Sequence, residues 1–142
     1  MNQLHVDLGV EEYALGSGVL RFNPADPNLY ARFLELEPQL QQLQEELNRG
    51  SEMAQDAAAV LKLLAETDRQ FKKMLTQVFG GENDFSRLLQ GINLLAMASN
   101  GSTVAENLLG ALEPVLNRGA ERFAQAQIQT AVEKARQRRE NR

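Results

Sequence analysis

A leucine-rich pattern with helical spacing over residues 26–47 places the strongest constraint on the fold. Its apolar residues are Leu29, Phe33, Leu36, Leu40, Leu43 and Leu47, which recur at alternating steps of four and three. This spacing puts them along one face of a helix. A second run follows at Leu61, Leu64, Phe71, Leu75 and Val78, with Asp68 in the place of a sixth apolar residue. Two such faces predict an antiparallel helical hairpin.

The stretch Asn48-Arg49-Gly50-Ser51 is the predicted break between these two helices. Glycine often ends a helix and serine often begins one, so we expect the first helix to end near Gly50. The second helix is then expected to begin after Ser51. It should run to Val78 or Phe79 and stop at the following glycine pair, residues 80–81.

Four residues, Phe22, Asn23, Pro24 and Asp26, are expected to organise the junction between a strand and the first helix. Asp26 can accept hydrogen bonds from the free amides of the first helical turn, and Pro27 suits the first helical position. Pro38 lies inside the helical pattern and removes one helical hydrogen bond. Because the leucines keep their stepping across it, the sequence predicts a kinked helix and not a break.

The N-terminal residues 4–22 show strand character. Leu4, Val6 and Leu8 alternate with polar residues, and Val19 to Phe22 follows the turn-forming Gly16-Ser17-Gly18. We therefore expect a short strand and then a β-hairpin. A two-stranded hairpin is marginal alone, so it needs a helical face or another chain, and its free edge is a candidate contact surface.

The C-terminal half predicts two more helices. Asn83 or Asp84 is expected to cap a shorter helix with one broad apolar face, formed by Phe85, Leu88, Leu89, Ile92, Leu95 and Ala96. Residues 99–102 form a turn, and Thr103 with Glu106 has the spacing of a capping box. The last helix starts there, with a second kink expected at Pro114 and a frayed end after about residue 130.

The length of 142 residues suits one domain, and 43% hydrophobic residues with only 6% aromatics suit a core of leucine, valine and alanine. The sequence thus predicts a single α+β, predominantly helical domain over residues 1–142. It comprises a β-hairpin region over residues 1–24, a helical core of about four helices over 26–128, and a basic tail over 129–142 that ends a long C-terminal helix.

Charge is unevenly distributed along the chain. Residues 133–142 carry five Lys or Arg and two acids, which leaves ten basic and seventeen acidic residues before them. The body is acidic and the tail basic. A basic tail without aromatic residues offers only salt-sensitive, sequence-independent contact with nucleic acid, so nucleic-acid binding is disfavoured as the main role.

Catalytic chemistry has little support in the sequence. His5 is the only histidine, cysteine is absent, and no cluster of Asp, Glu and His has metal-loop spacing. Gly16-Ser17-Gly18 precedes a predicted strand, whereas a phosphate loop needs a following helix. We expect no enzyme activity, cofactor or metal. The lack of cysteine, of a signal-peptide pattern and of a long apolar run leads us to expect a cytoplasmic protein without a membrane partner.

The faces of the predicted helices carry more apolar residues than a two-helix seam needs. The surplus is Leu34, Leu63, Met74, Phe79, Leu89, Leu94 and Leu109. Some of these are expected under the third and last helices, and the rest are expected to form a partner groove or an oligomer interface. Asp68 either reaches outward to Arg69, Lys72 or a helix end, or fixes register as a polar core residue. We favour the first because both cations are near in sequence.

Several stretches in this order resemble small proteins of phage and prophage tail-gene clusters of Gram-positive bacteria, the tail assembly chaperones. They are Leu8-Gly9-Val10-Glu11-Glu12-Tyr13, Val19-Leu20-Arg21-Phe22-Asn23-Pro24-Ala25-Asp26, Val78-Phe79-Gly80, and Asn100-Gly101 followed by Asn107-Leu108-Leu109. The resemblance covers most of the chain and carries no catalytic residue. The Gln-rich first helix and the basic end depart from it.

The resemblance implies a non-enzymatic chaperone that binds the long helical tape measure protein and helps recruit tail tube subunits. Partner contacts are then expected at Phe79, Phe85, Leu88 and Leu89. The alternative is a structural or adaptor component of a tail-like particle that forms a homo-oligomeric ring. Solution mass distinguishes these two readings in part, because a stable ring without partner favours the structural one.

Overall fold

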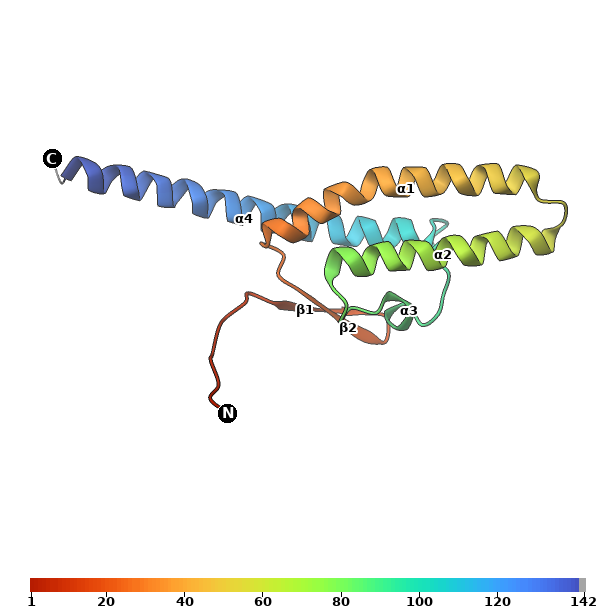
Figure 1. The fold of residues 1–142 in the computed structure, drawn as a ribbon, viewed down its shortest axis with the longest axis horizontal. Helices are drawn as coiled ribbons and strands as arrows, with labels where there is room; N and C mark the ends of the chain where they lie inside the picture. The colour runs from red at the N-terminus through yellow and green to blue at the C-terminus, as the bar shows by residue number, and fades with distance from the viewer. Residues whose placement is uncertain (141–142) are drawn as a thin grey trace.

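The computed structural model describes residues 1–140, which form a two-stranded hairpin followed by four helices (Figure 1). The elements are β1 (Glu11–Leu15), β2 (Gly18–Phe22), α1 (Pro27–Met53), α2 (Ala57–Phe79), α3 (Phe85–Leu88) and α4 (Val104–Glu140). The predicted α+β, predominantly helical fold is confirmed. Helices α1 and α2 lie side by side as an antiparallel hairpin, and the second half of α4 extends away from the rest (Figure 1).

The predicted β-hairpin is formed, but its turn has only two residues, Gly16 and Ser17, because Gly18 begins β2. Leu15 pairs with Gly18, and Gly16 has φ +58°, a positive φ of the kind that primed hairpin turns require at their first central position. Leu20 and Phe22 of β2 point into the core. The earlier strand expected within residues 4–8 is not formed, since that segment has no ladder partner and stays exposed.

The junction between β2 and α1 is built on side-chain caps. Asp26 is confirmed as the N-cap of α1, because its carboxylate accepts a hydrogen bond from the Asn28 amide at 2.9 Å. Asn23 accepts one from the Ala25 amide at 2.8 Å and donates to the Leu8 carbonyl at 2.9 Å. Pro24 is fully buried. Its carbonyl lies against α4 where Gly119 leaves room for it, so the junction fixes the crossing of α4.

The helical hairpin is longer than the sequence predicts. Helix α1 continues through Gly50 to Met53, so the prediction that Asn48-Arg49-Gly50-Ser51 separates the helices is wrong. Gly50 faces α2, where an added Cβ would lie 2.6 Å from a methyl carbon of Leu63. The glycine therefore allows close helix packing and does not end the helix. Asp56, which accepts from the Ala59 amide at 2.8 Å, is the actual cap of α2.

Pro38 and Pro114 both lie inside continuous helices, α1 and α4. The ribbon of α1 bends along its first half (Figure 1), which agrees with a kinked helix. Arg32 on α1 donates to the Val78 carbonyl at 3.0 Å, close to the C-terminal end of α2. Helix α2 ends at Phe79 as predicted, and Gly80 follows with φ +105°.

Helix α3 is a single turn, so the broad apolar helix expected from Phe85 to Ala96 is wrong beyond Leu88. Asp84 caps it, accepting from the Ser86 amide at 3.1 Å. The chain then leaves the helical path at Gln90 and Gly91, which both have positive φ. Hydrogen bonds from α2 to the following loop replace the helical ones, as described below.

The capping box that starts α4 is confirmed. The Glu106 amide donates to Thr103 Oγ1 at 3.1 Å, and the Thr103 amide donates to Glu106 Oε1 at 3.4 Å. Helix α4 packs on the core through residues such as Leu108, Leu112 and Leu116, and continues as an exposed helix to Glu140. The basic tail expected over 129–142 is thus helical to Glu140, and its last two residues lie outside the described residues.

Candidate partner-binding surface

The residues expected to bind a partner are core residues in the structure. Phe79, Phe85, Leu88 and Leu89 are all buried and belong to one cluster with β2, α1 and α4. The ring of Phe79 contacts those of Phe22 and Phe85, with centroids 5.0 and 5.7 Å apart. A partner therefore cannot reach these side chains on the folded surface. The reason is that the hairpin and α3 cover the face of α2 that carries Phe79.

The exposed apolar surface lies instead between α1 and the middle of α4. A hollow of about 400 Å³ is lined there by Tyr30, Phe33, Leu34, Leu36, Glu37, Leu40, Leu109, Glu113 and Asn117. A second hollow of about 300 Å³ shares Tyr30 and Leu34 with it and reaches Phe123. We call the two together the α1–α4 groove. Leu34 is 56% exposed in it, an unusual position for a leucine flanked by other apolar side chains.

Acidic side chains border this groove. Glu37 on α1 and Glu113 on α4 both line the first hollow, and Asp26 lines the second. Each of the two glutamates is exposed. An apolar groove with an acidic border suits a partner helix that carries apolar residues on one side and basic residues beside them.

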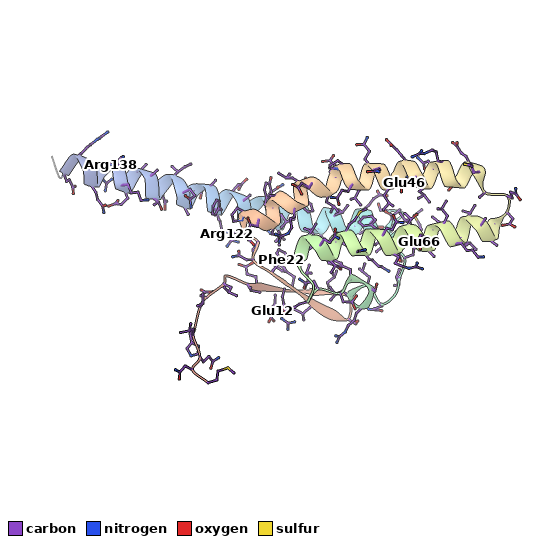
Figure 2. All side chains as sticks on the ribbon, viewed as in Figure 1. Glu12, Phe22, Glu46, Glu66, Arg122 and Arg138 are labelled. Carbon is purple, nitrogen blue, oxygen red and sulfur yellow. The ribbon has the colours of Figure 1, made fainter. Side chains whose placement is uncertain are left out.

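Beyond Phe123, α4 leaves the body of the molecule. Every residue from Glu121 to Glu140 is exposed, including Ile128 at 63% and Val132 at 53%. Figure 2 shows Arg138 near the end of this projecting helix, far from Glu46 and Glu66 on the helical hairpin. We call residues 124–140 the α4 tail. It combines exposed apolar residues with the basic end of the chain.

The N-terminal segment offers a second kind of surface. Leu4, Val6, Leu8 and Val10 alternate along it and are all exposed. Next to it, the outer edge of β1 has no strand beside it among residues 1–140. The outer edge of β2, by contrast, is closed by Asn83, whose side chain accepts from the Arg21 amide at 2.9 Å and donates to the Arg21 carbonyl at 2.8 Å.

The side chains that could bind a metal ion are dispersed over the described part of the chain. His5 lies exposed in the N-terminal segment, although not in the expected strand. No group of three or more His, Asp and Glu side chains within residues 1–140 is placed to hold a metal ion. Over the same residues, no helix combines the length and the apolar character needed to cross a membrane.

The environment of Tyr13 changes the acidity of its phenol. Burial raises the pKa of its phenol above the usual value, and the hydrogen bond that it donates to Glu11 at 2.5 Å adds to the effect. The negative charge of Glu11 acts in the same direction, because it disfavours a phenolate nearby. Tyr13 also stacks on Phe22, with ring centroids 4.9 Å apart, so it ties β1 to the core.

Comparison of the chain with protein-family models, with curated proteins and with solved structures gave no match.

Sequence reasoning pointed only in part to the α1–α4 groove. Leu34 and Leu109 belong to the predicted apolar surplus, and both line it. Tyr30 and Phe123 were not singled out as surface residues. A usable signal was the pair Tyr30 and Leu34, one helical turn apart and offset from the leucine seam.

Proposed function

We propose that this protein is a non-enzymatic phage tail assembly chaperone that holds an apolar helix of the tape measure protein in its α1–α4 groove. The observation that carries this proposal is the groove itself, an exposed apolar surface between two helices, in which Leu34 lines both hollows and is 56% exposed. Binding a helix in such a groove covers apolar surface of both chains, which is the requirement for keeping a long helical protein soluble during assembly.

The identity of the partner rests on the resemblance to tail assembly chaperones. A tape measure protein is long and helical, so it offers many amphipathic segments of the kind that the groove suits. Recruitment of the tail tube protein is part of the same proposal, as is action in the bacterial host cytoplasm. No membrane or nucleic acid takes part in this role.

Co-purification tests the proposal directly. The tagged chain is expressed with the tape measure protein of a tail gene cluster and recovered by affinity capture. We expect the wild-type chain to retain the tape measure protein and Leu34→Asp to lose most of it. A charged side chain in the groove must be desolvated when a helix binds.

Leu61→Asp is the matched control, because Leu61 is 65% exposed on α2 and lies outside the groove. It should bind as the wild type does. Equal capture by Leu34→Asp and wild type would exclude the groove as the binding site. Failure of the wild-type chain to capture the tape measure protein would reject the proposed function.

A structural or adaptor component that forms a ring is the second candidate. The free edge of β1 and the exposed segment over residues 4–10, where apolar and polar residues alternate, favour it. Strand addition from copy to copy is a head-to-tail contact that can close a ring. Val6→Pro would remove a donor from such an added strand. Rings in purified wild-type protein that Val6→Pro abolishes would favour this candidate over the chaperone.

A further inference from the structure

We propose that the α4 tail binds in the α1–α4 groove of a second copy, so that the free protein is a two-fold dimer with two tail-in-groove contacts. The tail presents an apolar stripe of Ala124, Ile128, Ala131 and Ala135, with Val132 beside it. These positions recur at helical steps and face one direction. An exposed apolar stripe on a helix that projects alone is a candidate contact surface.

The groove of a second copy has the right length for the tail. The tail is about 25 Å long from Ala124 to Glu140, since an α-helix rises about 1.5 Å per residue. The groove runs beside α4 from Phe123 back to Leu109, which is about 21 Å by the same measure. Two antiparallel α4 helices that cross near Phe123 therefore place each tail along the groove of the other copy.

Charge complementarity indicates in which direction the tail lies along the groove of the second copy. Its far end, residues 133–140, carries four basic residues, Lys134, Arg136, Arg138 and Arg139, and two acidic ones, Glu133 and Glu140, so its net charge is +2. In the antiparallel arrangement this end reaches the part of the partner groove that holds Glu37 and Glu113. A parallel arrangement would instead carry the basic end away from both glutamates.

The tail cannot fill the groove of its own chain. Helix α4 is continuous from Val104 to Glu140, and its second half points away from α1 and α2 (Figure 1). Reaching its own groove would require the helix to break and reverse near Phe123. The second copy is therefore the occupant that the continuous helix allows. Each dimer has two equal contacts, as an isologous interface requires.

Sedimentation velocity of the purified full-length chain tests this inference. At about 100 µM, well above micromolar dissociation constants, we expect a particle with twice the 15.8 kDa of one chain. The tail variant Ile128→Asp with Val132→Asp and the groove variant Leu34→Asp should each weaken the dimer about tenfold or more, because each places a charge in the apolar contact. Leu61→Asp is the control and should remain dimeric.

A mixture of the tail variant and the groove variant makes the test specific. The tail variant keeps an intact groove and the groove variant keeps an intact tail, so the mixed dimer regains one of the two contacts. We expect more dimer in the mixture than in either variant alone. A monomeric wild type overturns the inference, and so does a dimer that survives both sets of substitutions. Circular dichroism confirms that the variants remain helical.

This inference and the proposed function can fail separately. The dimer is measured without any tape measure protein, and the tail variant keeps the groove that the chaperone role needs. A tail variant that stays dimeric contradicts only the inference. A monomeric tail variant that captures no tape measure protein contradicts only the proposed function. If both hold, the tape measure helix competes with the tail, and its addition should convert dimer into a one-to-one complex.

Discussion

The ammonium group of Lys72 lies 2.8 Å from the carboxylate of Asp68, and both groups are almost fully shielded from solvent. The pair also holds the loop after α3: Asp68 accepts from the Leu94 amide at 2.7 Å, and Lys72 donates to the Ile92 carbonyl at 2.9 Å. The buried pair therefore replaces the hydrogen bonds of a longer third helix. It also places Leu94 in the core.

Asp68→Ala should lower the free energy of unfolding by about 3 kcal/mol, because it leaves the Lys72 ammonium buried without its counter-ion. Urea denaturation measures this change. Lys72→Met should lower the free energy of unfolding by a similar amount. The loss of stability in the double variant should be smaller than the sum of the two single losses, with a coupling free energy of about 1 kcal/mol or more. Additive losses would show that the pair does not act as a unit.

Glu66→Gln is the control for this prediction, because Glu66 pairs with Arg69 on the exposed face of the same helix. Such exposed pairs contribute about 0.5 kcal/mol or less. A loss as large as that of Asp68→Ala would mean that any charge change on α2 destabilises the fold.

Asn83→Ala should lower the free energy of unfolding by about 2–3 kcal/mol, since it leaves the buried carbonyl of Phe79 and two partly buried backbone groups of Arg21 without their partner. The buried amide of Asn83 makes two hydrogen bonds with Arg21 and donates to the Phe79 carbonyl at 2.9 Å, so it joins β2 to the end of α2. Thermal unfolding followed by circular dichroism measures the loss. Asn117→Ala is the control and should change the midpoint little, because it removes an exposed side chain of α4 that has no hydrogen bond within residues 1–140.

Local signals in the sequence were sufficient to predict where several helices and strands begin or end. The hairpin turn at Gly16, the cap at Asp26 and the capping box at Thr103 each depend on residues within three positions of one another. Their geometry is set by short-range hydrogen bonds and by backbone conformation. The same holds for the end of α2 before Gly80.

The predictions that were wrong concern positions where packing between distant parts of the chain decides the structure. Glycine is typical of a helix end, but Gly50 lies inside α1. Its small size there lets Leu63 of the facing helix approach closely. The stretch after Leu88 has a helical apolar pattern, but side chains of α2 bind its backbone. Burial of Phe79 likewise depends on where α3 and the hairpin pack. None of these contacts can be deduced from spacing along the chain, so the sequence indicated only Leu34 and Leu109 of the groove and placed the partner contacts on residues that are buried.

Gly119→Ala should destabilise the fold by about 3 kcal/mol, because the added methyl group clashes with backbone atoms. A Cβ at this position would lie 1.8 Å from the carbonyl oxygen of Pro24. Relief requires α4 or the junction to move as a whole. Chemical denaturation measures the loss.

Gly110→Ala on the same helix should have the opposite effect, because no heavy atom apart from its chain neighbours and the nearby backbone of α4 lies within 4 Å of a Cβ built there. Replacing a glycine inside a helix by alanine should then stabilise the protein by about 0.5–1 kcal/mol. If both substitutions destabilise the fold equally, the close contact between Gly119 and Pro24 does not govern the packing of α4.

The raised pKa of Tyr13 predicts a loss of stability at alkaline pH. The folded state holds the phenol proton more tightly than the unfolded state does, so this contribution is fully present below the usual tyrosine pKa and is lost as the pH rises through the folded value. The chain has two tyrosines, so Tyr30→Phe leaves Tyr13 as the sole reporter. Its absorbance at alkaline pH should rise later than that of the same chain unfolded in urea.

Glu11→Gln in the Tyr30→Phe background separates the causes of that shift. The substitution removes the negative charge beside the phenol, while burial, the largest cause, remains. We expect the titration of Tyr13 to move only part of the way toward the usual tyrosine value. A complete return would mean that Glu11, and not the packing of Tyr13 against Phe22, sets the acidity. No change at all would place the carboxylate of Glu11 away from the phenol in solution.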